Sequence, residues 1–256
     1  MNFELFEAVP ACLLGARGND TARALADADW VLRRKQDGRY LAVTCADRIR
    51  ALCPHAWQGV LQRQTNAGVL RHLYEGDARL GGETLPLRGL PVLLRELGIA
   101  ASYGRERGLP QVPEAACLSF AGRDRFRRPL WLTAVTGLAW THMRRAAADD
   151  GIVLEAISGY RSHAYQAGIF RRKRARGIAL EAILEVNAAP GYSEHHSGRA
   201  LDIGTPGEPP AETSFETTPA FAWLQEHAAD FGFDMSYPRA NPHGIVYEPW
   251  HWCYRP

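Results

Sequence analysis

The chain has 256 residues, of which 46% are hydrophobic and 23% charged, and its formal net charge is +2. This length and composition are typical of one large or two small globular domains that can bury a core without disulfides or a structural metal. The small net charge argues against a nucleic-acid-binding protein. No stretch of the sequence approaches the roughly 20 apolar residues of a membrane span.

The first hundred residues predict short mixed elements. Apolar residues at helical spacing favour a helix over 21–36 with Asp20 as its N-cap, and residues 40–45 have strand composition. A short helix is expected over 90–97, ended by Gly98. The N-terminus begins acidic, and the apolar piece at 8–16 contains Pro10, so we expect no secretory signal. The compartment and the export route stay open.

Glycine, proline and charged residues are frequent between positions 98 and 129. Such composition indicates a break between domains. We therefore expect an N-terminal region of unknown role over 1–122 and a second domain over 123–256.

The second half predicts helices and strands that do not alternate regularly, which favours an α+β fold. An amphipathic helix is expected over 130–149, with His142 in or near the core. The other expected elements are a strand over 152–157, helices over 162–177 and 219–231, and strands over 244–247 and 250–254. A basic run at 171–176 is interpreted as a solvated helix face, and attraction to an anionic wall polymer is the alternative.

The five cysteines are Cys12, Cys45, Cys53, Cys117 and Cys253. They lack CxxC spacing, so a cysteine zinc site is not expected. Cys45 and Cys53 could pair in an oxidising compartment, or they could be two buried thiols.

Three short stretches supply the chemistry: 158–162, 193–202 and 248–251. Together they contain imidazoles and a carboxylate that can hold one Zn²⁺ and leave a coordination position open, and a further glutamate that can act as a base. The alternative is a surface loop with a histidine pair, followed by an aromatic edge strand.

Two of these stretches make geometric predictions. A strand over 199–203 places Ala200 and Asp202 on one face and two apolar residues on the core face. Pro249 favours a bend that could bring Glu248 and His251 to one site. Arg161, where a strand passes into a helix, could hold a carboxylate or a developing oxyanion, or form an ordinary salt bridge.

The motifs together are specific. Ser-x-His-x-x-Gly-x-Ala-x-Asp occurs at 193–202, Glu-x-Trp-His at 248–251, and Ser-Gly-Tyr-Arg-Ser followed by Gln at 158–166. Over residues 128–256 the chain resembles the VanY-type D-alanyl-D-alanine carboxypeptidases of the LAS group of zinc peptidases. The resemblance implies a small antiparallel sheet flanked by helices, to which this chain adds an N-terminal α+β region.

The resemblance also implies roles for single residues. One Zn²⁺ per chain would be bound by His195, Asp202 and His251, with Glu248 activating water and Arg161 stabilising the oxyanion. Ser193 and Gln166 would help position the terminal carboxylate of the substrate, and Ser162 is expected to contact the substrate. His196 would either support a neighbouring metal ligand without binding the metal, or face solvent. Cys253 departs from the family pattern, because relatives often have arginine after Trp-His-Trp.

The expected activity is hydrolysis of peptidoglycan stem peptides by a D,D- or L,D-carboxypeptidase that releases a terminal D-amino acid. Two alternatives stay open: a peptidoglycan endopeptidase of the endolysin or toxin type, and a zinc-bearing binding module without turnover. The N-terminal region could recognise the cell wall or a protein partner.

Overall fold

The computed structural model describes residues 1–46, 48–74 and 84–255. The chain divides into two compact units, Met1–Leu85 and Pro86–Pro256. Residues 86–122 thus belong to the same unit as the C-terminal half, whereas the sequence placed the boundary at 122/123. The physical reason is that the leucine-rich segment after Pro86 buries its side chains within this unit.

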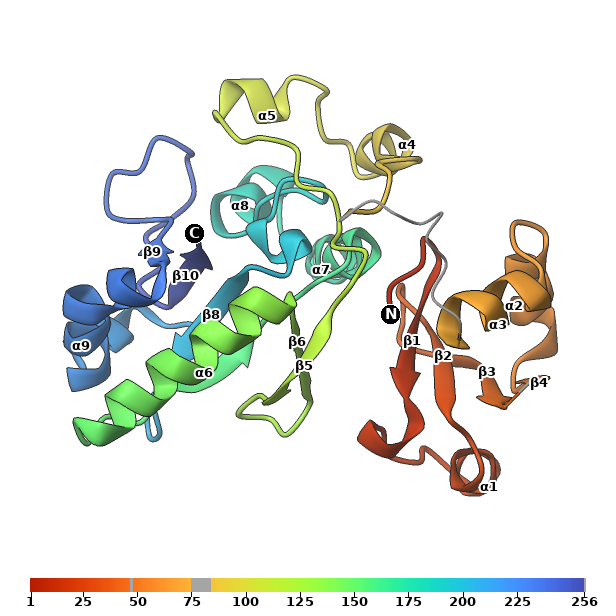
Figure 1. Ribbon diagram of the computed structural model, residues 1–256. Helices are drawn as coiled ribbons and strands as arrows, with labels where there is room; N and C mark the ends of the chain where they lie inside the picture. Colours follow the sequence, from red (N-terminus) through yellow and green to blue (C-terminus); the bar gives the residue numbers. More distant parts are fainter. Residues whose placement is uncertain (47, 75–83, 256) are drawn as a thin grey trace. The chain divides into compact units, whose positions relative to one another are not determined.

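The first unit is an antiparallel sheet with helices (Figure 1). The strands β1 (Phe6–Pro10), β2 (Trp30–Arg34), β3 (Tyr40–Cys45) and β4 (Arg48–Ala51) pair in sequence order. The helices are α1 (Asn19–Ala26), α2 (Pro54–Leu61) and α3 (Asn66–Tyr74). Phe6, Leu32 and Trp57 belong to the core of this unit.

The predicted helix over 21–36 is wrong in its second half. The alanine-rich start forms α1, but residues 30–34 form β2, which pairs with both β1 and β3. Trp30, Val31 and Leu32 are aromatic, β-branched and apolar, and sheet pairing on both edges overrides a helical spacing that is only a weak preference. The strand predicted over 40–45 is confirmed as β3.

The second unit is built on a four-stranded antiparallel sheet in the order β7-β8-β10-β9. Its strands are β7 (Glu155–Ser158), β8 (Ala200–Gly204), β9 (Phe233–Met235) and β10 (His251–Tyr254). The helices α6 (Ala134–Asp149) and α9 (Pro219–His227) share a core with the apolar side chains of β8. Leu201 and Ile203 lie in that core, as the predicted strand alternation requires.

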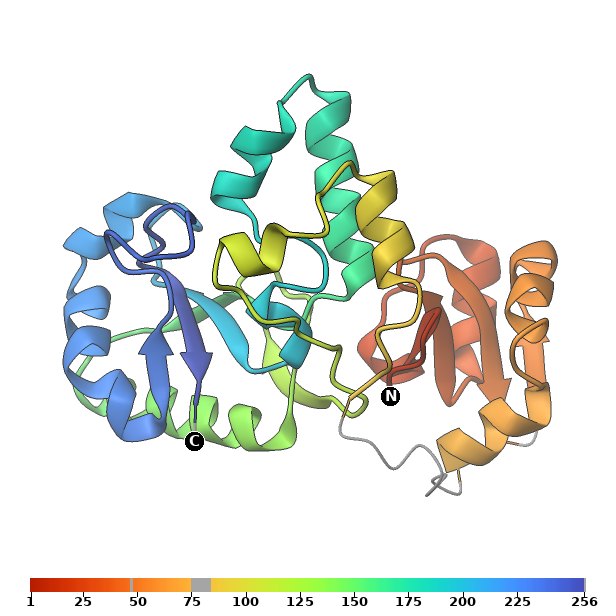
Figure 2. The same cartoon turned by 90° about the horizontal axis from the view of Figure 1, so that it is seen from above.

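A second layer of helices belongs to the same unit. It consists of α4 (Leu90–Glu96), α5 (Tyr103–Glu106), α7 (His163–Ala175) and α8 (Leu180–Val186), which share a core that includes Leu94, Phe170 and Ile183. Figure 2 shows the sheet between α6 on one side and the α7–α8 pair on the other. Polar side chains of β8 that point away from α6 therefore point toward this second layer.

Smaller elements complete the structure. A hairpin is formed by β5 (Ser119–Arg123) and β6 (Pro129–Leu132). The 3-10 helices are η1 (Ala11–Leu13), η3 (Glu194–Ser197), η4 (Thr213–Thr217) and η5 (Ala228–Phe231). Within the described ranges, no helix is long and apolar enough to cross a membrane. The five cysteines are free thiols.

The predicted helix over 130–149 starts too early. Leu130 and Leu132 are buried on alternate positions of β6, and the helix begins only after Thr133, whose hydroxyl accepts from the Thr136 N–H. This start sets the helical phase, so Trp140 is buried and His142 is exposed, contrary to the expectation of a core histidine.

The remaining predictions are mixed. The short helix over 90–97 and the helix over 162–177 are confirmed as α4 and α7, and the strands over 152–157 and 250–254 appear in shortened form as β7 and β10. The helix over 219–231 is split into α9 and η5. The strand predicted over 244–247 is wrong, because this segment is irregular and the Val246 N–H donates to the end of α8 at Glu185 O.

Candidate active site

Asp202 lies at the centre of a row of polar side chains across the sheet. His251 on β10 is its direct neighbour in the β8–β10 pairing, and Ser158 on β7 is its neighbour on the other side. Paired residues on adjacent strands point to the same face of a sheet. Because Leu201 and Ile203 occupy the core face, the polar row is directed toward the second layer of helices.

His195 reaches Asp202 from η3, the turn that precedes β8. Gly198 joins the two elements at a φ of 68°, a left-handed conformation that suits glycine. His195 Nδ1 lies 2.7 Å from Gly159 O, and Nε2 lies 3.2 Å from Asp202 Oδ1. A carbonyl can only accept, so Nδ1 carries the proton and the Nε2 lone pair of the neutral ring faces the carboxylate.

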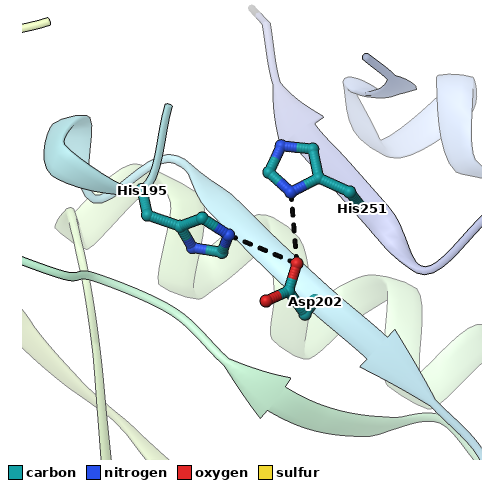
Figure 3. Close-up of side chains that lie close together, drawn as sticks. All are labelled: His195, Asp202 and His251. Carbon is teal, nitrogen blue, oxygen red and sulfur yellow. Dashed lines mark hydrogen bonds and ion pairs between the residues drawn. The ribbon is translucent and has the colours of Figure 1, made fainter. Parts of the chain in front are cut away.

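His251, on β10, meets the same oxygen of Asp202 (Figure 3). Its Nδ1 lies 3.1 Å from Asp202 Oδ1, and its Nε2 lies 2.9 Å from Glu194 Oε2. Arg255 donates to the other oxygen of Glu194. One potential ligand atom from each of His195, Asp202 and His251 lies within 4.8 Å of the other two.

The charges of these buried groups favour a cation between them. Burial and the guanidinium of Arg161 lower the pKa of His195 to about 4, so this ring is neutral. Burial opposes ionisation of Asp202, but Arg161 and the hydrogen bond from His251 hold its pKa well below the usual range. The pKa of His251 is raised to about 10 against burial by Asp202 and Glu194. His195 therefore offers a lone pair and Asp202 a carboxylate, and His251 carries a proton that a metal ion can displace.

The second oxygen of Asp202 is fixed by the predicted strand-to-helix motif. Ser158 Oγ donates to Asp202 Oδ2 at 2.7 Å, and an Arg161 terminal nitrogen donates to it at 2.8 Å. Arg161 thus forms a salt bridge, which is one of the two expectations for it. The Arg161 Nε–H is buried, and no acceptor within the described part of the chain takes it.

Glu248 lies beside the three donors. Its Oε2 is 3.9 Å from His251 Nδ1, since the bend at Pro249 places the two side chains on one site as predicted. Burial raises the pKa of Glu248 to about 7, with the attraction of His251 opposing and the repulsion of Asp202 adding to the rise. A carboxyl group that titrates near neutral pH can both accept and return a proton.

A cavity of about 410 Å³ opens onto these groups. Besides the three donors and Glu248, its lining includes Arg161, Gln166 and Ser193. Ser162, which was predicted to contact substrate, is not among the lining residues. Its hydroxyl accepts from the Tyr165 N–H and caps α7.

The structure also places two residues whose surroundings the sequence left open. His196 is fully buried, its Nδ1 lies 2.6 Å from Arg161 O and its Nε2 accepts from the Gly191 N–H. It therefore supports the backbone of Arg161 and does not face solvent. Cys253 is buried, and burial raises the pKa of its thiol to about 12, so it is inert as a nucleophile.

Sequence reasoning missed two contributors. Glu194 holds the far nitrogen of His251, and its position directly before His195 was the available signal. Glu114 lies outside the recognised motifs, yet its carboxylate accepts from Tyr160 OH and from the His163 N–H on either side of Arg161. No local pattern marks Glu114.

The comparisons agree with this geometry. The family model described as VanY, D-alanyl-D-alanine carboxypeptidase, matches residues 130–256. The C-terminal half of the chain belongs to the VanY family. The VanY domain resembles the solved LdcB LD-carboxypeptidase, with 30% sequence identity and a TM-score of 0.51 over 57% of this chain and 71% of that one.

Curated relatives match over the same half. The putative carboxypeptidase YodJ of Bacillus subtilis is 37% identical over 121 residues, which are 43% of this chain and 41% of that protein. A D-alanyl-D-alanine carboxypeptidase of Enterococcus faecium is 38% identical over 96 residues, 37% of this chain and 27% of that protein. The chain therefore spans less than half the length of these relatives.

Proposed function

We propose that the VanY domain is a zinc-dependent peptidase that hydrolyses peptidoglycan stem peptides as a D,D- or L,D-carboxypeptidase. The observation that carries the proposal is the convergence of His195, Asp202 and His251 on one point, with Glu248 beside them in a cavity. The relatives named D-alanyl-D-alanine carboxypeptidase and LD-carboxypeptidase support the substrate class.

The donor set fits zinc. Two imidazoles and one carboxylate form a three-residue set of the kind found in catalytic zinc sites, and each imidazole is oriented by an outer acceptor, Gly159 O or Glu194. A site with three protein ligands leaves one position for water or substrate. Bound Zn²⁺ would supply an acidified water and polarise the scissile carbonyl.

The chain's own residues would carry the protons. Glu248 would accept a proton from the attacking water and return it to the leaving amine, a role suited to its pKa of about 7. Arg161 would stabilise the negative charge on the carbonyl oxygen. For this its guanidinium would donate to the substrate while it keeps its hydrogen bond to Asp202. Its unpartnered Nε–H and its place in the cavity wall support that role. Ser193 and Gln166 remain the proposed substrate contacts.

The deciding experiment uses zinc-loaded full chain and its Glu248→Ala variant on defined stem tetra- and pentapeptides. We expect the wild type to remove one terminal residue, seen as a single mass loss, and the variant to bind zinc while losing cleavage. Full activity of Glu248→Ala would refute the assigned base. Opening of cross-linked muropeptides without loss of terminal residues would indicate the endopeptidase, and zinc content without any cleavage would indicate the binding module.

Recognition of a wall polymer or a protein partner by the unit Met1–Leu85 stays a prediction. Sedimentation of this unit with purified cell walls, compared with the second unit alone, would test it.

A further inference from the structure

Lys173 is the one member of the basic run at 171–176 that lines the active-site cavity. Its neighbours Arg171, Arg172 and Arg174 are exposed, as the prediction of a solvated helix face requires, whereas Lys173 is half-buried. The position in the helical repeat thus separates this lysine from the solvated face. The mechanism described above does not use it.

The ammonium group of Lys173 is held by a hydrogen bond to the residue that directly follows α8. Lys173 Nζ donates to Asn187 Oδ1 at 2.5 Å, and Gln166 Nε2, two turns earlier on α7, donates to Ala188 O at 2.8 Å. Seven residues correspond to about 10 Å along a helix axis. Lys173 and Gln166 nevertheless bond to the adjacent residues Asn187 and Ala188. Lys173 therefore extends the part of the cavity wall that begins at Gln166.

Lys173 has a charge that the protein leaves uncompensated at close range. No carboxylate of residues 1–46, 48–74 or 84–255 lies within 4.0 Å of its nitrogen, whereas Arg161, the other strong cation in the cavity wall, is paired with Asp202. Burial lowers the pKa of Lys173, and the more distant Glu248 opposes that effect. Asn187 is neutral and accepts one of the three ammonium protons, so donors remain for an anion.

We propose that Lys173 binds a carboxylate of the peptide substrate and thereby strengthens binding of the peptide in this cavity. The inference rests on the proposed function, because it names a substrate feature read in the same cavity. Two sources can supply the carboxylate: the free terminus of the peptide, or an acidic side chain at its third position. The same ammonium–carboxylate chemistry applies to both, so the experiment must separate them.

The test measures peptide binding by calorimetry in a Glu248→Ala background, where the substrate is not consumed. The probes are a stem pentapeptide with diaminopimelate at position three, the same peptide with a terminal carboxamide, and the same peptide with an amidated third side chain. The affinity of each probe is measured for the Glu248→Ala protein, called the parent, and for the parent carrying Lys173→Met or Arg172→Met. Arg172→Met is the control, because it removes the same charge from the exposed face of α7. Methionine keeps the apolar stem of the lysine.

We expect one of the two amidations to weaken binding to the parent and to Arg172→Met at least about 10-fold, the scale of a charge-assisted hydrogen bond. The same amidation should leave binding to Lys173→Met unchanged, and Lys173→Arg should restore the discrimination. Equal losses in Lys173→Met and the parent, or no loss from either amidation, would overturn the inference. Cleavage by the wild type is scored separately, so the proposed function can fail while the binding preference stands.

Discussion

Asp202 and His251 face each other across the paired strands β8 and β10, and Asp202 Oδ1 lies 3.1 Å from His251 Nδ1 and 3.2 Å from His195 Nε2. Residues 49 positions apart are thereby placed by sheet register and not by a flexible loop. A site built on paired strands is held more rigidly than one built on loops.

Removal of the central carboxylate should damage stability as well as metal binding. In metal-free protein, Asp202→Ala leaves the buried Arg161 charge without its carboxylate and protonated His251 with Glu194 alone, which we expect to cost about 3–5 kcal/mol of unfolding free energy. Denaturant titration in the presence of a chelator measures this. Asp230→Ala, at an exposed position, is the control and should change little. Equal stability of the two variants would contradict the buried-charge account.

Glu194 should tune metal affinity without contacting the metal. Glu194→Gln removes the charge that orients His251 through Nε2, so we expect zinc affinity to fall about 10–100-fold while all three ligands remain. Competition with a chromophoric chelator gives the affinity directly. Glu226→Gln removes a carboxylate that is 77% exposed and should leave the affinity unchanged. An unaltered affinity in Glu194→Gln would show that His251 does not need this partner.

Metal binding should release a proton and strengthen as pH rises. In the metal-free protein the pKa of His251 is raised to about 10, so the ring is protonated near neutral pH and zinc must displace that proton from Nδ1. Zinc affinity should therefore increase roughly tenfold per pH unit in this range. Calorimetry in two buffers with different ionisation enthalpies should report about one proton released. A flat profile without proton release would mean that His251 is neutral before the metal arrives.

The second unit should require residues upstream of the family match. A fragment over 86–256 keeps α4, α5 and Glu114, whereas a fragment over 123–256 loses them. The buried side chains lost are Leu90, Leu94, Leu97, Ile99, Tyr103 and Leu109, each worth about 1.5–3 kcal/mol on burial. Because that sum is comparable with the whole stability of a domain, we expect only the longer fragment to unfold cooperatively. Cooperative melting of the shorter one would place the boundary nearer 122/123.

Part of the fold could be predicted because its signals are local. The N-cap Ser162 and the alternation of Leu201, Asp202 and Ile203 act over a few residues, and both elements appear as expected. The errors at 21–36 and 130–149 arise where an apolar pattern fits both a helix and a strand. Only pairing with another strand decides between them, and that strand lies outside the segment whose pattern is read.

The sequence by itself determined the residue types of the site, because the spacing of His195, Asp202, Glu248 and His251 is a property of the chain. Only the tertiary structure decided which oxygen of Asp202 faces the imidazoles, that Glu194 and Ser158 orient the donors, and that Lys173 leaves the solvated face of its helix for the cavity. The physical reason is that hydrogen bonding and burial depend on strand register and helix packing, which join segments far apart in the chain.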